Sequence, residues 1–222
     1  MPRLAFSARV SADTLVPAET PTPHGLLRQA DCYQQVGVKY PQRGTFHSYA
    51  ELLHAALLEG DSTVSHYVPQ PYRLRLGRRI YIPDCYVVQA GQRRVVELKP
   101  RGEFDDAMQR AVTAFLAEHR QHFEVIANES VFAREQEALN WLHIVRALVA
   151  ARALDTCADE QAVLDDCRSA TGITLGALCD PTDRLAAPRR EIALYRLLHR
   201  GRLRASLAEH PLDFTTEVRL CD

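Results

Sequence analysis

The chain has 222 residues, of which 46% are hydrophobic and 25% charged, and its formal net charge is −1. This composition suits a globular protein with a sizeable core, in one domain or in a larger and a smaller one, and it excludes disorder of the whole chain. The near-neutral charge excludes a uniformly basic surface, so any nucleic-acid binding must use local patches or a partner. No apolar run approaches the roughly 20 residues of a membrane span, so we expect a soluble protein.

The cysteines show no C-x-x-C spacing, and the N-terminus lacks the apolar stretch of a signal peptide. Both observations predict a protein of the reducing cytoplasm with free, buried thiols. The cysteines are Cys32, Cys85, Cys157, Cys167, Cys179 and Cys221.

Residues 1–44 carry prolines and threonines and are weakly periodic, most clearly in VPAETPTPHG. We expect little regular structure there and interpret the segment as an arm laid over the rest of the chain. The next stretch, FHSYAELLHAALLEGD, has apolar residues at helical spacing, which predicts a helix that Ser48 can cap and Gly60 can end.

Three short strand-like runs follow in YRLRLGRRIYIPDCYVVQAGQRRVVELKP, separated by Gly77 and by Ala90-Gly91, which predicts a meander. DDAMQRAVTAFLAEHRQHF is typical of an amphipathic helix, and FEVIAN of one more strand. Hairpin strands, a crossover helix and a further strand predict an α/β fold, in which a mixed sheet is flanked by helices.

Two acids and a lysine lie on neighbouring predicted strands. Asp84 lies in the middle run and Glu97 near the end of the next, so antiparallel pairing across Gly91 brings both carboxylates toward one edge of the sheet. Strand alternation points Lys99 to the same face as Glu97 and Leu98 to the opposite face. An acid-x-Lys triplet alone occurs by chance about once per 140 residues, so it needs the support of Asp84.

Two carboxylates and the Leu98 carbonyl oxygen form a hard oxygen site that suits Mg²⁺, with Mn²⁺ as a substitute. A lysine beside it can hold or deprotonate the attacking water and offset the charge that builds on the phosphorane. The set predicts phosphodiester hydrolysis. There are plainer explanations: Asp84 can shape a strand entry, and Glu97 with Lys99 can form a solvated ion pair.

Pro83-Asp84 with Glu97-x-Lys99 resembles the PD-(D/E)xK signature of restriction-endonuclease-like nucleases. The wider stretches SYAELLHAALLEGDSTVSHYVPQPYRL, YIPDCYVV and VVELKP resemble the TnsA family of transposon-end endonucleases. The resemblance covers about residues 40–130 and does not extend to the N-terminal arm.

The resemblance implies a third catalytic acid, Glu51, in an S-x-x-E helix start, and makes Glu59 a non-catalytic acid. Periodicity alone places Glu51 across the helix from the apolar stripe, at solvent or a cleft. Gln70, which precedes Pro71, is interpreted as structural. Three histidines have no ligand spacing and are expected in surface or partly buried roles, namely His47, His54 and His66.

The resemblance further implies a bacterial, cytoplasmic DNA endonuclease subunit of a heteromeric transposase. Such a subunit cleaves the 5′ strands at transposon ends in concert with a DDE transposase of the TnsB type, and an AAA+ regulator of the TnsC type is a further partner. Two rival functions stay open: a stand-alone restriction or repair nuclease, and a non-enzymatic winged-helix DNA-binding regulator. The intact acid-acid-lysine set counts against the regulator.

A local excess of basic residues accompanies the predicted site. It fits a phosphate-rich partner such as DNA. For Arg78 and Arg79 the alternative is an edge strand that its charges protect from aggregation. The basic residues are Arg73, Arg75, Arg78, Arg79, Arg93, Arg94, Lys99 and Arg101.

The last third predicts helices over ALNWLHIVRALVAARAL, DEQAVLDDCRSATG, ITLGALCD and RREIALYRLLHRG, then two strands of a wing in RLRASL and FTTEVRL. Thr174 can cap the short helix, and Gly201 can end the long one. A helix in this order can enter the major groove, whereas the TnsA resemblance implies docking on the transposase or the ATPase, and the sequence leaves both open. The arginines available are Arg189, Arg190, Arg196, Arg200, Arg202 and Arg204.

We therefore expect three parts in the chain: an N-terminal arm over residues 1–44, an endonuclease core over residues 45–134, and a winged-helix-like C-terminal domain over residues 135–222.

Overall fold

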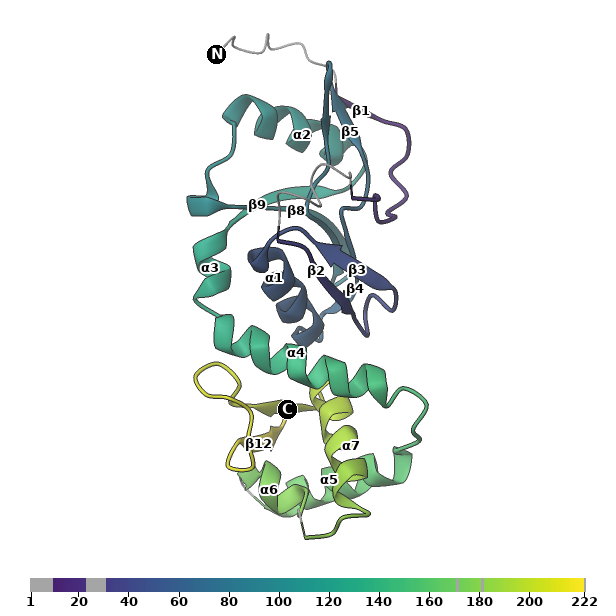
Figure 1. Cartoon of the computed structure of the whole chain (residues 1–222), viewed down its shortest axis with the longest axis vertical. Helices are drawn as coiled ribbons and strands as arrows, with labels where there is room; N and C mark the ends of the chain where they lie inside the picture. Colours follow the sequence, from purple (N-terminus) through teal and green to yellow (C-terminus); the bar gives the residue numbers. More distant parts are fainter. Residues whose placement is uncertain (1–9, 23–30, 171, 181, 222) are drawn as a thin grey trace. The chain divides into compact units, whose positions relative to one another are not determined.

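The structure is a computed structural model that describes residues 10–22, 31–170, 172–180 and 182–221 (Figure 1). The chain divides into two compact units. Unit 1 comprises Met1–Ala55 and Thr63–Ala133, and unit 2 comprises Ala56–Ser62 and Arg134–Asp222. Helix α1 (Tyr49–Gly60) therefore contributes its first residues to unit 1 and its last residues to unit 2.

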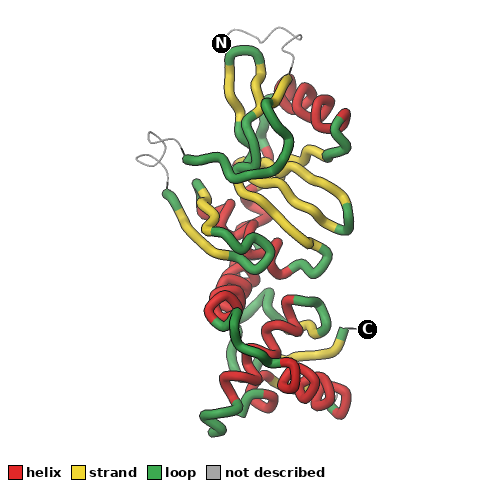
Figure 2. Tube along the Cα trace, turned by 90° about the vertical axis from the view of Figure 1, so that its right-hand side faces the viewer, coloured by secondary structure: helices red, strands yellow, loops and turns green. Residues whose placement is uncertain are grey.

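A four-stranded mixed sheet lies at the centre of unit 1 (Figure 2). Its strand order is β4-β7-β8-β9, with all pairs antiparallel except the parallel β8-β9 pair. The parallel pair is joined by a crossover that contains helix α2, which buries Val112 and Leu116 completely. The strands are β4 (Val64–Pro69), β7 (Cys85–Gln89), β8 (Gln92–Lys99) and β9 (His122–Ala127), and α2 spans Asp106–Glu118.

The predicted α/β class is confirmed by this arrangement. The turn between β7 and β8 is formed by Ala90 and Gly91 at φ 47° and φ 78°. Two successive residues with positive φ match the twist of a tight hairpin, which is why this turn joins antiparallel neighbours. Two short elements, η2 (Pro100–Gly102) and α3 (Asn128–Phe132), follow β8 and β9.

Two smaller sheets complete unit 1, and they correct the expectation of little regular structure before residue 45. Strand β1 lies on the edge of a sheet ordered β1-β5-β6, and β2 pairs with β3. These strands have three or four residues each, too few to show periodicity, and β1 finds its partner more than 60 residues later. Their bounds are β1 (Val10–Ala12), β2 (Tyr33–Val36), β3 (Arg43–Phe46), β5 (Leu74–Leu76) and β6 (Arg79–Tyr81).

The predicted meander is also wrong in one respect. Its middle run divides at Pro83 and Asp84, because β6 pairs with β5 in one sheet and β7 pairs with β4 and β8 in another. A proline has no N–H for a strand ladder, so the run ends there. Asp84 consequently lies in the bend before β7 rather than inside a strand.

Unit 2 combines helices with a three-stranded sheet ordered β10-β12-β11. Helices α5 and α7 pack together, and the side chain of Thr174 caps α6 by accepting a 3.2 Å hydrogen bond from Ala177 N–H. Four helices and a pair of strands lie where they were predicted in the last third, but β10 was not expected, because ITLGALCD was predicted as a short helix. The elements are α4 (Glu135–Ala150), α5 (Cys157–Ser169), β10 (Ile173–Thr174), α6 (Leu175–Leu178), α7 (Ala187–His199), β11 (Leu203–Ala205) and β12 (Glu217–Leu220).

The end of α1 fits closely into unit 2. A Cβ atom added to Gly60 would lie 2.2 Å from the indole of Trp141, so only glycine fits there. Two residues of unit 2, Glu59 and His199, form a buried pair in which Oε2 and Nε2 are 2.9 Å apart. Glu59 therefore bonds to a residue of unit 2, whereas the acids predicted as catalytic belong to unit 1.

The cysteines are free thiols, and burial was predicted for all six. That prediction is wrong for Cys32, Cys157 and Cys221, which are exposed because they lie just outside or at the first residue of a regular element. Among the described residues, none of the helices combines the length and apolarity needed to cross a membrane.

Candidate active site

Helix α1 positions Glu51 at its first turn. The Ser48 hydroxyl donates a 2.9 Å hydrogen bond to Glu51 Oε1 and accepts one from the Glu51 N–H at 3.2 Å. His47 N–H donates to Oε2 at 3.1 Å. The contacts resemble a capping box, with the carboxylate accepting from the N–H of His47 instead of that of Ser48, and they explain a serine and a glutamate at this spacing without any catalytic role. It also turns the carboxylate back toward the start of the helix, and Glu51 is only 8% exposed.

The β7-β8 hairpin brings Asp84 and Glu97 together, because Cys85 pairs with Val96. Asp84 Oδ2 accepts a 2.7 Å hydrogen bond from the backbone N–H of Leu98. The two acids that were predicted to converge are therefore brought together by a single hairpin turn and its register.

Both oxygens of Glu97 have partners. The Tyr81 hydroxyl donates to Oε2 at 2.6 Å, and Lys99 Nζ lies 2.5 Å from Oε1. Glu97 is 3% exposed, so this ion pair is not the solvated one that a strand end would form. Lys99 is partly exposed and lies on the same face as Glu97, as strand alternation predicts.

The three carboxylates influence one another electrostatically. Burial raises the pKa of Asp84 well above its ordinary value, and the charges of Glu97 and Glu51 raise it further. Burial likewise raises the pKa of Glu51, with Glu97 adding to the effect. Buried acids whose pKa is raised by neighbouring carboxylates, as for Asp84 and Glu51, are typical of functional sites.

Lys99 carries its proton in this setting. Burial acts to lower the pKa of Lys99, but the charges of Glu97, Asp84 and Glu51 outweigh it, so the pKa is raised. An ammonium can donate hydrogen bonds and stabilise negative charge, but it cannot accept a proton. The structure therefore favours charge stabilisation over proton abstraction for this side chain.

The ligand atoms offered here are oxygens, and carboxylate oxygens are the ligands that Mg²⁺ prefers, so the residue types suit a hard divalent cation. Within the described residues, however, no three side chains of His, Cys, Asp or Glu are placed to hold a metal ion as they stand. The predicted ligands are two carboxylates, of Asp84 and Glu97, and the Leu98 carbonyl. Tyr81 and Lys99 each contact one Glu97 oxygen, and because each carboxylate oxygen has a second lone pair, a cation can bind through Glu97 beside them.

Sequence reasoning missed Tyr81 and placed Gln70 outside the site. Tyr81 is an aromatic residue in an apolar run, where packing is the ordinary explanation. Gln70 donates a 2.8 Å hydrogen bond from Nε2 to Glu51 Oε2, a contact that no local pattern could reveal. His47 and His66 are partly buried, as expected, and bond to Thr22 and to the Lys39 carbonyl, whereas His54 is buried, contrary to expectation.

The basic residues around the site fall into two groups. Arg94 is paired with Glu124, and Arg75 lies 2.9 Å from Asp13. In the described parts of the chain, Arg78 and Arg79 form no ion pair, and they are exposed at the turn of the β5-β6 hairpin. Tyr81 lies at the other end of the same hairpin, and its hydroxyl contacts Glu97. The hairpin therefore carries the exposed arginines at its turn and a contact to the acids at its base.

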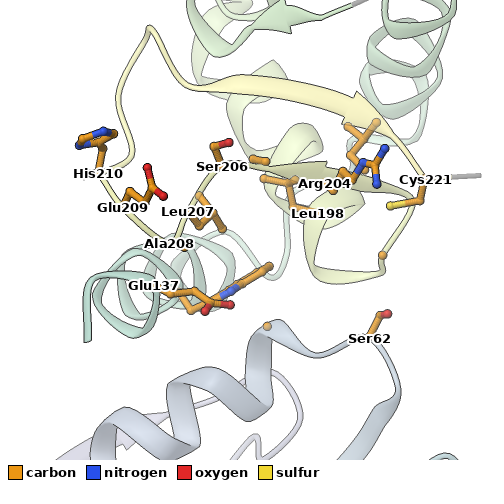
Figure 3. Close-up of a pocket in the computed structure, with 15 residues that line it drawn as sticks. Ser62, Glu137, Leu198, Arg204, Ser206, Leu207, Ala208, Glu209, His210 and Cys221 are labelled. Carbon is orange, nitrogen blue, oxygen red and sulfur yellow. The ribbon is translucent and has the colours of Figure 1, made fainter. Parts of the chain in front are cut away.

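A cavity of about 550 Å³ lies within unit 2 (Figure 3). Trp141 and Leu198 contribute apolar surface, while Arg204 and Cys221 lie toward one end and His210 toward the other. Its lining contains none of the predicted catalytic residues. The acids are thus grouped in unit 1, whereas this cavity is lined by residues of unit 2.

Comparison with known proteins found no match: no family model and no curated protein matches the sequence.

Proposed function

We propose that the protein is a Mg²⁺-dependent DNA endonuclease subunit of a TnsA-type heteromeric transposase, which cleaves the 5′ strands at transposon ends beside a DDE transposase. The observation that carries the proposal is the grouping of Glu51, Asp84, Glu97 and Lys99. They come from a helix start, a bend and a strand end, yet the charge of Glu97 raises the pKa of Glu51, Asp84 and Lys99, and Lys99 Nζ lies 2.5 Å from Glu97 Oε1. Acids scattered by chance over a surface do not gather in this way around one partly exposed ammonium.

The arrangement of unit 1 supports a restriction-endonuclease-like core. An antiparallel hairpin carries Asp84, Glu97 and Lys99, a crossover helix leads to the parallel strand β9, and a preceding helix supplies Glu51. This order of elements is the one that the PD-(D/E)xK resemblance implies.

The chemistry then divides between the cation and the side chains. Asp84, Glu97 and the Leu98 carbonyl would hold the metal, with Glu51 as the third acid, and the bound ion supplies Lewis-acid polarisation and a more acidic water. The Lys99 ammonium stabilises negative charge on the phosphate oxygens. Only two lysines, Lys39 and Lys99, occur in a sequence that otherwise uses arginine, which makes a lysine at this position conspicuous.

Unit 2 is proposed as a winged-helix-like module for protein docking. The order α5, α6, α7 and a β11-β12 wing supports the winged-helix description. Arg189 lies 2.9 Å from Asp159, Arg200 lies 2.6 Å from Glu160, and Arg190 is paired with Asp166.

The acids of α5 thus neutralise much of the charge that α7 would offer to DNA. Each exposed pair contributes little stability, but the loss of net positive charge weakens phosphate attraction. A partner in the AAA+ regulator or the transposase fits this surface better than a major groove.

The test is end cleavage of a transposon plasmid by the purified protein with its transposase and Mg²⁺. Asp84→Ala and Glu97→Ala should abolish 5′-strand cleavage, and Lys99→Ala should lower it ~10²–10⁴-fold. Lys39→Ala, which removes the other lysine, should cleave at the wild-type rate. Undiminished cleavage by the Asp84 and Glu97 variants would remove the assignment. Sequence-specific double-strand cleavage without the transposase would instead identify a stand-alone nuclease.

A further inference from the structure

Gln70 joins three separate parts of unit 1. Its N–H donates a 2.9 Å hydrogen bond to the Asp84 carbonyl, and its own carbonyl accepts one from Thr20 N–H at 2.8 Å. Its side-chain Nε2 donates to Glu51 Oε2, also at 2.8 Å. With 4% of its surface exposed, Gln70 is as buried as a core residue. It therefore touches two of the three acids, one through its side chain and one through its backbone.

The backbone of Gln70 is strained. Its φ is 41°, in the left-handed region that costs a non-glycine residue energy and that glycine adopts freely. Such strain persists only where the surroundings impose it, and it is concentrated at functional sites. A side chain is thus present at a position where glycine would be less strained.

The side-chain oxygen of Gln70 is buried, and among the described residues it has no hydrogen-bond partner. The orientation of the amide follows from Glu51, because an ionised carboxylate only accepts hydrogen bonds and must face the NH₂ group. Oε1 is therefore the acceptor that remains. A buried acceptor without a donor is unfavourable, and in native proteins it often marks a place where water or a ligand binds.

We propose that Gln70 is a positioning residue for the three acids Glu51, Asp84 and Glu97. Its NH₂ group fixes the carboxylate of Glu51, and its Oε1 accepts a hydrogen bond from a water molecule of the hydrated divalent cation. The second half rests on the proposed function, whereas the first half concerns the metal-free protein. Two experiments separate them.

The first experiment measures thermal unfolding of the metal-free protein for Gln70→Met, Glu51→Ala and the double variant. Methionine keeps the length of the side chain and removes the amide. If the pair is coupled, the losses in Tm are not additive, and the double variant unfolds close to one of the single variants. Additive losses would show that Gln70 does not hold Glu51 and would overturn the proposal.

The second experiment measures Mn²⁺ binding by calorimetry, a readout that does not depend on cleavage. Gln70→Met should bind Mn²⁺ about 10–100-fold more weakly, as is usual for residues that orient metal ligands. Gln70→Gly should show the same loss although it relieves the strained φ, so its Tm should lie within about 5 °C of wild type. The matched control is Gln121→Met, a buried glutamine that accepts a 2.5 Å hydrogen bond from Tyr72.

The control should lower Tm and leave Mn²⁺ affinity unchanged. Wild-type affinity in both Gln70 variants would overturn the role of Oε1. Absence of Mn²⁺ binding by the wild-type protein would instead refute the proposed function and, with it, the water-binding role. The unfolding cycle alone would then decide whether Gln70 positions Glu51.

Discussion

Tyr81 ends strand β6, and its hydroxyl donates a 2.6 Å hydrogen bond to Oε2 of Glu97 in the neighbouring sheet. Its ring lies 5.9 Å from that of Phe104, which in turn lies 5.8 Å from Phe123. The aromatic ring is therefore held by packing, while the hydroxyl fixes one oxygen of a predicted metal ligand.

Tyr81→Phe should keep the fold and lower the rate of cleavage about tenfold, because the ring contacts remain and only the donor to Glu97 is lost. The measurement is the single-turnover rate of end cleavage with saturating Mg²⁺. Tyr72→Phe is the matched control, since it also removes a buried hydroxyl, one that is bonded to Gln121. Equal rates for both variants would show that Tyr81 serves packing alone.

Asp84→Asn should stabilise the metal-free protein at neutral pH. The pKa of Asp84 is raised in the folded state by burial and by Glu97 and Glu51, so the folded protein holds this proton to higher pH than the unfolded chain. Stability is consequently lost as pH rises from the ordinary aspartate value near 4 through the raised value. Asparagine removes that loss and still offers an oxygen to Leu98 N–H.

We expect Asp84→Asn to unfold about 2–4 °C above wild type at pH 7.5 in EDTA, and the difference to shrink toward pH 4. Asp13→Asn, which changes an exposed aspartate, provides the comparison. An Asp84→Asn protein that is less stable than wild type at both pH values would contradict the sign. Cleavage should be lost in the same variant, which separates stability from activity.

Glu51 and Glu59 should differ in what their loss affects. Glu59→Ala leaves the buried His199 without this hydrogen-bond partner in unit 2, and an unsatisfied buried polar group costs about 1–3 kcal/mol. We expect a lower Tm and, below it, cleavage at the wild-type rate. Glu51→Ala should abolish cleavage at a temperature where it is folded. Circular dichroism melts beside the cleavage assay check both, and the reverse pattern would mean that Glu59 is the catalytic acid.

The arginines of the β5-β6 hairpin should carry part of the DNA contact. Replacing Arg78 and Arg79 by alanine should weaken binding to any sequence and reduce the slope of log K against log[salt] by about 1–2, since each phosphate contact contributes ~0.9. Fluorescence anisotropy at low salt measures this. Arg43→Ala with Arg110→Ala removes the same charge elsewhere in unit 1. An equal change in slope for both pairs would show only a general effect of net charge.

Local patterns in the sequence predicted the longer helices and the β7-β8 hairpin but not the short α3, because caps, glycines and apolar spacing act over a few residues. The same patterns missed β1 and β4, which pair with later, non-adjacent strands, and β2 and β3, which are too short to show periodicity. They also missed the break at Pro83, since the apolar run continues across it into a different sheet.

In the candidate site, too, the sequence predicts contacts that depend on local structure and misses those between distant elements. The approach of Asp84 to Glu97 follows from one turn and its register, so the sequence could predict it. Glu51 looked solvent-facing from helical periodicity, and only the family resemblance indicated it; in the structure its carboxylate is buried through contacts with Ser48 and Gln70. The amide and hydroxyl groups that hold the acids come from distant elements and leave no periodic signal.

The β7-β8 register has a kinetic consequence. Asp84 and Glu97 are separated by a single hairpin, and a hairpin closes in roughly 1–10 μs because little chain entropy is lost. Glu51 reaches them only after β4 has paired with β7, and the sheet is completed only after α2 has carried the chain back to the parallel strand β9. We therefore expect the pair of acids to form early in folding and the third acid to join it late. We expect cation affinity to appear with the slowest phase of refolding, when α1 docks, rather than with the first burst of strand formation.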